Sequence, residues 1–157
     1  MKLIQKTIVL VSTLDTKGTE AAFLKGLIQK RGHRVILLDT NTGGKAFLSP
    51  DISAEAVAKA AGWDIEEVRK MKDTGKVSSI MIEGAIKKVK SLLEKGELDG
   101  IVSFGGASNT TIATTIMKSL SFGIPKVMVS TIASGDMRPY VGTKDITFIH
   151  SVTDIVG

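Results

Sequence analysis

Short, mostly apolar runs alternate along this chain with stretches that have the periodicity of amphipathic helices. The five runs are residues 7–11, 35–38, 100–103, 126–130 and 146–149. Runs of this length are typical of parallel strands, which lie buried on both faces of a sheet, and the helical stretches supply the crossovers between them. The pattern predicts an α/β fold, Rossmann-like and doubly wound, with a mainly parallel five-stranded sheet and helices on both faces.

Start and stop signals delimit the helical stretches. Serine and aspartate favour helix N-caps, and glycine favours the position just after a helix. These signals predict helices that end at Arg31-Gly32, begin at Ser53, run from Asp64 to Gly75, and cover 77–95 and 112–120.

Composition excludes several functional classes. The chain of 157 residues is predicted to form one domain, and it has no cysteine, which rules out disulfide frameworks and thiolate chemistry. His33 and His150 have no metal-ligand spacing, so no metal site is predicted. A signal peptide and a membrane-length apolar run are missing, which predicts a cytoplasmic protein without a membrane partner. The net charge of +5 is spread over the chain and aromatic residues are few, so we expect an anionic ligand and no nucleic acid.

Small polar residues follow four of the predicted strands. They occupy residues 12–18, 39–41, 105–111 and 130–136. In open α/β sheets the carboxyl ends of parallel strands share one edge, and ligands bind there. We therefore expect these four loops to converge on one site.

The loop that begins at Gly105 resembles an anion seat. Gly105 and Gly106 end a strand, and hydroxyl and amide side chains then open a helix, whose first N–H groups carry partial positive charge. The loop lacks both the P-loop spacing and the third glycine of the dinucleotide fingerprint. On its own it is a weak signature.

Three charged residues at the strand ends each have two interpretations. Lys17, at a predicted helix start, either neutralises a phosphate or points into solvent. Asp15 either caps that helix or orients a metal ion or a hydroxyl group. Asp39 either contacts a ribose hydroxyl, as an acidic residue at this position does in dinucleotide folds, or serves the turn.

Several segments together resemble the ATP-binding domain family of the tomato mosaic virus resistance protein. The resemblance covers nearly the whole chain and rests on residues 12–20, 50–53, 105–106, 129–136 and 151–155. It implies a Rossmann-like lobe that binds ATP at the strand ends. The chain departs from the family's Gly-Gly-Ser-Gly-Gly-Thr at Gly105 to Thr110, and the family's second α/β lobe is absent from residues 1–157. A homo-oligomer or a separate second-lobe subunit is therefore expected.

The prediction is a nucleotide-binding domain whose ligand is ATP, with or without Mg²⁺. Two alternatives remain: a subunit of a Mg-ATP-dependent ligase, phosphotransferase or hydrolase, and a structural subunit that binds phosphate incidentally. The expected site residues are Asp15, Thr16, Lys17, Asp39, Thr40, Gly105, Gly106, Ser108, Asn109, Thr110, Ser134 and Gly135.

Overall fold

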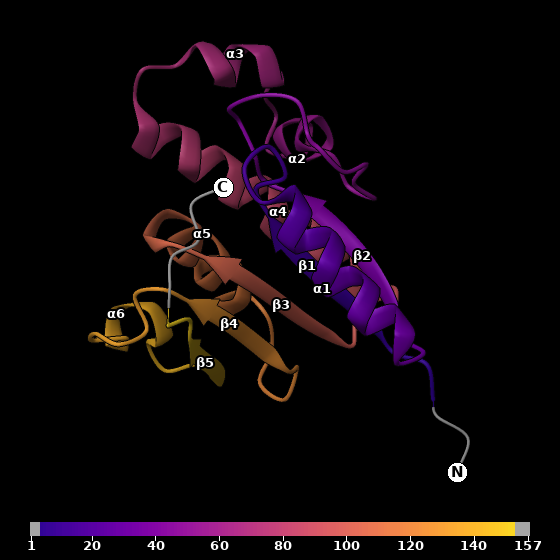
Figure 1. Ribbon diagram of the computed structural model, residues 1–157. Helices are drawn as coiled ribbons and strands as arrows, with labels where there is room; N and C mark the ends of the chain where they lie inside the picture. Colours follow the sequence, from indigo (N-terminus) through magenta and orange to yellow (C-terminus); the bar gives the residue numbers. More distant parts are fainter. Residues whose placement is uncertain (1–3, 153–157) are drawn as a thin grey trace.

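A computed structural model describes residues 4–152 of the chain, so part of the segment 151–155 lies outside the described residues. Five parallel strands form one sheet in the order β2-β1-β3-β4-β5 (Figure 1). The strands are β1 (Thr7–Ser12), β2 (Arg34–Asp39), β3 (Gly100–Gly105), β4 (Lys126–Ser130) and β5 (Ile146–His150). The helices are α1 (Gly18–Lys30), α2 (Ala54–Ala60), α3 (Ile65–Lys70), α4 (Thr74–Glu94), α5 (Ala107–Lys118) and α6 (Arg138–Val141).

Helices lie on both faces of the sheet, as predicted. On one face α1 packs over β1 and β2, with Leu24 and Ile28 against Leu10 and Leu37. The larger core lies on the opposite face, where α2, α4 and α5 pack against residues such as Val11. Figure 1 shows α1 in front of β1 and β2, and α5 behind β3. The predicted doubly wound, Rossmann-like sheet is confirmed.

The helix boundaries between residues 64 and 95 differ from the prediction. We expected the shorter helix to reach Gly75, but α3 ends at Lys70 and α4 begins at Thr74. Asp73 sets the start of α4, because its carboxylate accepts the amide N–H of Lys76 at 3.0 Å. An N-cap bond of this kind outweighs the poor helix propensity of Gly75 in the first turn. The predicted N-caps Ser53 and Asp64 are confirmed.

A buried lysine fixes the amino ends of β4 and β5. Lys126 is 1% exposed, and its ammonium donates to the carbonyls of Ser121 and Ile124, each at 2.8 Å, and to Asp145 at 2.7 Å. Hydrogen bonds from Lys126 and from the Gly123 amide lower the pKa of Asp145 to about 2. The Asp145 carboxylate therefore stays ionised well below neutral pH, and its ion pair with Lys126 joins the strand starts.

Candidate functional site

The strand order creates a crevice at the carboxyl ends of β1 and β3. The chain passes from β1 outward to β2 and then returns across β1 to form β3 on its other side. Ligands of open α/β sheets bind at such a reversal of strand order. A cavity of about 510 Å³ lies there, within the usual range for small-molecule sites. Its lining consists of Thr13, Asp15, Thr16, Lys17, Thr40, Asn41, Thr42, Gly43, Ser78, Gly105, Gly106, Ala107, Ser108, Asn109 and Ile112.

A tight turn after β1 brings Lys17 to the cavity. The carbonyl of Thr13 accepts the amide of Lys17 at 2.9 Å, and Lys17 occupies the N-cap position of α1 without a side-chain cap. Its ammonium lies 3.5 Å from the carboxylate of Glu20 in the first turn. Asp15 lines the cavity and does not cap α1. The turn thus places one cation and one anion in the lining.

The turn after β3 exposes the start of α5. Gly105 has a φ of +145°, a conformation that L side chains rarely adopt. Gly106 is the N-cap of α5, and no side chain among the described residues caps it. The amides of Ala107, Ser108 and Asn109 precede the first intrahelical hydrogen-bond donor, which is the amide of Thr110. The cavity wall therefore carries the uncapped, partially positive end of a helix of 12 residues.

Asn109 connects this helix start to the sheet below it. Its side-chain amide donates to the hydroxyl of Ser103 at 3.3 Å and to the carbonyl of Phe104. Ser103 in turn donates to the carbonyl of Val11 at 2.8 Å. The Asn109 Oδ1 atom is buried and has no hydrogen-bond partner among the described residues. This chain of contacts fixes α5 relative to β3 and β1.

Thr110 lies beneath the cavity. Its hydroxyl contacts the hydroxyl of Ser130 at 2.7 Å and donates to the carbonyl of Gly106 at 2.8 Å, and its own amide bonds the same carbonyl at 2.9 Å. Thr110 is fully buried and absent from the lining, so its bonds join the loop at Gly106 to β4 without facing the cavity. Ser134 and Gly135, which follow β4, are exposed and are not part of the lining.

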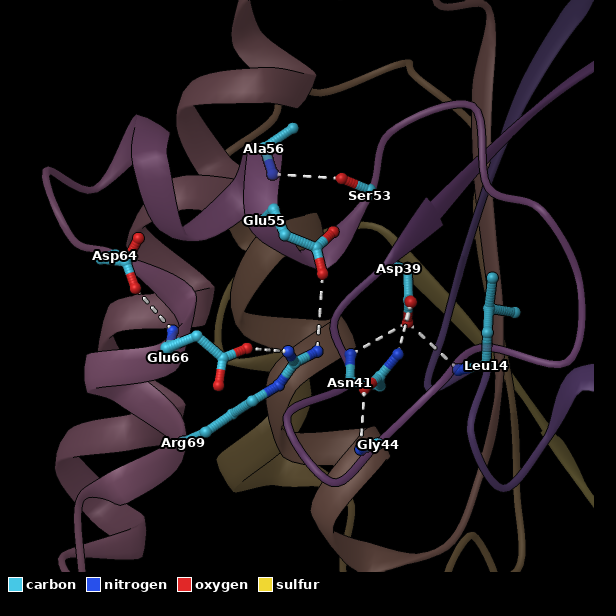
Figure 2. A network of polar contacts seen from close by, with 10 residues as sticks. All are labelled: Leu14, Asp39, Asn41, Gly44, Ser53, Glu55, Ala56, Asp64, Glu66 and Arg69. Carbon is cyan, nitrogen blue, oxygen red and sulfur yellow. Dashed lines mark hydrogen bonds and ion pairs between the residues drawn. The ribbon is translucent and has the colours of Figure 1, made fainter.

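Asp39 joins the loops that follow β1 and β2. Its Oδ1 atom accepts the amides of Leu14 at 3.1 Å and Asn41 at 2.9 Å, and its Oδ2 atom accepts the Asn41 side-chain amide at 2.5 Å (Figure 2). Asn41 also accepts the amide of Gly44 at 3.4 Å. Burial raises the pKa of the Asp39 carboxyl, while the bonds from Asn41 and Leu14 act to lower it. Asp39 is 2% exposed, so its contacts are internal to the protein.

A second cavity, of about 420 Å³, adjoins the first through Asn41. Asp39 belongs to the lining of this second cavity, as does Arg69 of α3. The guanidinium of Arg69 lies 2.5 Å from Glu66 and 3.5 Å from Glu55 (Figure 2). Its charge is therefore already compensated within the protein.

The structure brings most of the sequence-predicted residues together. Those that line the first cavity are Asp15, Thr16, Lys17, Thr40, Gly105, Gly106, Ser108 and Asn109. Seven lining residues were not among the predicted site residues: Thr13, Asn41, Thr42, Gly43, Ser78, Ala107 and Ile112. Thr13 and Asn41 belong to the loops 12–18 and 39–41 that were predicted to converge, so their positions were a usable signal. Ser78 lies inside α4, and nothing in the local sequence marks it.

The part of the chain that the structure describes contains no cluster of three or more histidine, aspartate or glutamate residues able to hold a metal ion. Among residues 4–152, no helix is both long and apolar enough to cross a membrane.

Comparisons with known proteins give the chain a family. A UPF0261 protein of Clostridium tetani is 48% identical over 152 residues, which is 97% of this chain and 38% of that protein. A Rhizobium meliloti relative is 40% identical over the same share of this chain and 37% of its own length. The ToMV resistance protein Tm-1(GCR237) of Solanum lycopersicum is 41% identical over 64 residues, 41% of this chain and 8% of that protein.

A crystal structure of Drosophila melanogaster DJ-1β has a TM-score of 0.39 and 15% identity, covering 94% of this chain and 75% of that chain. With respect to the Clostridium tetani and Rhizobium meliloti proteins, the chain spans less than two fifths of their length. The model of the "Uncharacterised protein family (UPF0261) N-terminal domain" matches residues 6–157, and the chain belongs to that family.

Proposed function

We propose that the cavity between β1 and β3 binds a nucleotide through its phosphates, with ATP as the first candidate. The observation that carries this proposal is the uncapped start of α5, which opens into the same cavity as Lys17. Backbone N–H groups at a helix start, combined with the helix dipole, form a favourable site for a phosphate. The sequence resemblance supplies the choice of ATP.

The remaining lining suits a polyphosphate. Thr13 and Thr16 belong to the lining and their hydroxyls lie 3.3 Å apart, which leaves one hydroxyl proton of the pair to donate to a phosphate oxygen. Thr40 also lines the cavity, but its hydroxyl donates to the carbonyl of Ser12 at 3.4 Å. Asp15 is an anion in this lining, and it would repel a bare polyphosphate. We therefore propose the Mg²⁺ complex of ATP, with Asp15 as the residue that faces the metal ion.

Calorimetric titration with ATP, ADP, AMP and inorganic phosphate, each with and without Mg²⁺, tests the proposal. Two variants probe the two features that carry it. Lys17→Ala removes the cation, and Ala107→Pro removes one amide donor at the first position of α5, where proline is tolerated. Each variant is expected to weaken ATP binding by about tenfold, equivalent to about 1.4 kcal/mol.

Lys25→Ala is the matched control, because Lys25 lies on the same helix as Lys17 but its ammonium is 3.6 Å from Asp51, away from the cavity. It is expected to leave the affinity unchanged. If no nucleotide binds under conditions that detect a Kd of about 100 μM, or about 5.5 kcal/mol of binding free energy, the proposal fails. Binding that survives both site variants would place the nucleotide elsewhere.

A further inference from the structure

On the face of the sheet that carries α1, the helix covers β1 and β2, and the strands become more exposed toward β5. Paired residues Leu37, Leu10, Val102, Val127 and Thr147 form a row across all five strands on the α1 face. Leu37 and Leu10 are fully buried beneath α1, Val102 and Val127 are partly exposed, and Thr147 is exposed. Burial therefore falls steadily with distance from α1.

The next row has the same gradient and is more apolar. Phe104 pairs with Val129, which pairs with Ile149, and the Ile149 side chain is 50% exposed. On the opposite face of the sheet, the neighbouring row is covered, because Ser103 and Met128 are both fully buried. Figure 1 shows the near side of β3, β4 and β5 without a helix in front of it. Among the described residues, Val127, Val129 and Ile149 pack against neither apolar core, whereas Val102 and Phe104 lie at the edge of the core beneath α1.

One flank of helix α1 adjoins this uncovered face. Lys25 reaches Asp51, which bonds the amide of Leu37 on the outer side of β2. Phe23 and Leu27 lie on the other flank of the helix, toward β3, by the 100° spacing of helical residues. The Phe23 side chain is 69% exposed. An aromatic ring thus borders the apolar sheet face.

We propose that this face, formed by Val102, Phe104, Val127, Val129 and Ile149, is the docking surface for an apolar helix face. The helix would come from the region that follows this domain in full-length members of the family. Parallel sheets are covered by helices on both faces, so the missing layer is expected to be helical. The chain matches an N-terminal domain, and its bacterial relatives have most of their length outside the matched part.

A second copy of the chain fits the face less well. Two copies meeting by this face would stack sheet on sheet, which is unusual for parallel sheets. A copy that offered an outer helix face instead would make a head-to-tail contact, which leads to rings or open filaments. None of the five residues of this face lines the cavity, so the proposal is independent of the nucleotide.

Thiol labelling gives a direct test, because the chain has no cysteine of its own. Ile149→Cys places one thiol on the face, and Phe122→Cys, at a side chain 65% exposed before β4, serves as the control. Both variants are prepared in the chain alone and in one polypeptide that joins it to the following region of the Clostridium tetani relative, with any cysteine in that region replaced by serine. In the joined protein we expect labelling at position 149 to slow at least tenfold and labelling at 122 to stay unchanged.

Equal labelling rates at position 149 in the two proteins would overturn the proposal. Labelling in the chain alone that slows as protein concentration rises would assign the face to a second copy, which also overturns it. Ile149→Lys provides a second readout that does not need a thiol. It is expected to lower the melting temperature of the joined protein while leaving that of the chain alone unchanged.

Discussion

Asp39 illustrates how a single buried carboxylate positions a binding loop. Its two oxygens accept three hydrogen bonds from Leu14 and Asn41, residues on separate loops that both border the cavity region. With both oxygens engaged and 2% exposure, the side chain is placed to hold the loops that follow β1 and β2 at a fixed separation. We therefore assign Asp39 a positioning role in the proposed site.

Replacing Asp39 with asparagine tests this role. The variant leaves the Asn41 side-chain amide facing a second amide donor, and an unsatisfied buried donor costs about 1–3 kcal/mol. We expect faster hydrogen exchange at the amides of Leu14 and Asn41, and weaker ATP binding. Asp51→Asn is the control, because Asp51 also accepts a backbone amide, at 2.8 Å, but from Leu37 within β2 and not from the loops that follow β1 and β2. It is expected to change stability without changing affinity, and equal loss of affinity in both variants would refute the role.

At the scale of elements, the packing of α4 on α2 depends on a glycine. A Cβ atom at Gly84 would lie 1.9 Å from the carbonyl oxygen of Val57, so the two helices approach closely only because that atom is missing. Glycine in a helix interior costs about 1 kcal/mol relative to alanine, and the close packing offsets this cost. Since Ser78 of α4 lines the cavity, the same contact also positions one wall of the site.

Gly84→Ala is therefore expected to destabilise the protein, although alanine is the better helix former. Overpacking typically costs about 1–3 kcal/mol, and the backbone of α2 has to move to relieve the clash. Gly26→Ala, within α1, is the matched control because nothing lies within 4 Å of its would-be Cβ. It should stabilise the fold by about 0.5–1 kcal/mol. Urea unfolding of both variants measures the difference, and a neutral Gly84→Ala would show that the helices can separate without cost.

At the scale of the whole molecule, the cavity exists only because distant segments meet. Residues after β1, β2 and β3, together with Ser78 of α4, contribute to one lining. A ligand at this cavity binds the folded chain and not the unfolded chain, in which the cavity does not exist. Binding therefore shifts the unfolding equilibrium of the entire domain toward the folded state.

ATP is accordingly expected to raise the melting temperature. At a concentration one hundred times the Kd, the stabilisation is about 2.7 kcal/mol, which corresponds to about 5–10 °C for a domain of this size. The Lys17→Ala variant, with about tenfold weaker binding, should show about half of that shift at the same ATP concentration. Differential scanning fluorimetry provides the measurement, and identical shifts in the two proteins would argue against Lys17 as a phosphate ligand.

Local sequence signals were sufficient for the strands and for two of the helix starts. Buried strands require continuous apolar runs, which are visible in the local sequence. Ser53 and Asp64 each accept a backbone amide two or three residues further on, so these helix starts also depend on neighbouring residues. The boundary between α3 and α4 was predicted wrongly, because the Asp73 cap competed with the glycine signal at Gly75. The small helix α6 has four residues and no apolar periodicity, which left nothing to predict it from.

The glycine turn at Gly105 and Gly106 was predicted from the sequence alone, because glycines at a strand end are a local feature, but α5 begins at Ala107 and not near residue 112 as predicted. The role of this turn as an anion-binding site stays a prediction. Only the tertiary structure decided its surroundings. Strand order determines which strand ends are neighbours along the shared edge, and β1 lies next to β3, so Lys17 lines the same cavity as Gly105, whereas Ser134, which follows β4, lies outside its lining. Strand order depends on long-range packing and not on any local pattern. The uncovered sheet face has the same origin, because β4 carries apolar residues on both faces, Val127 and Val129 on one and Met128 on the other, and only the placement of α1 and α5 decides which face is covered.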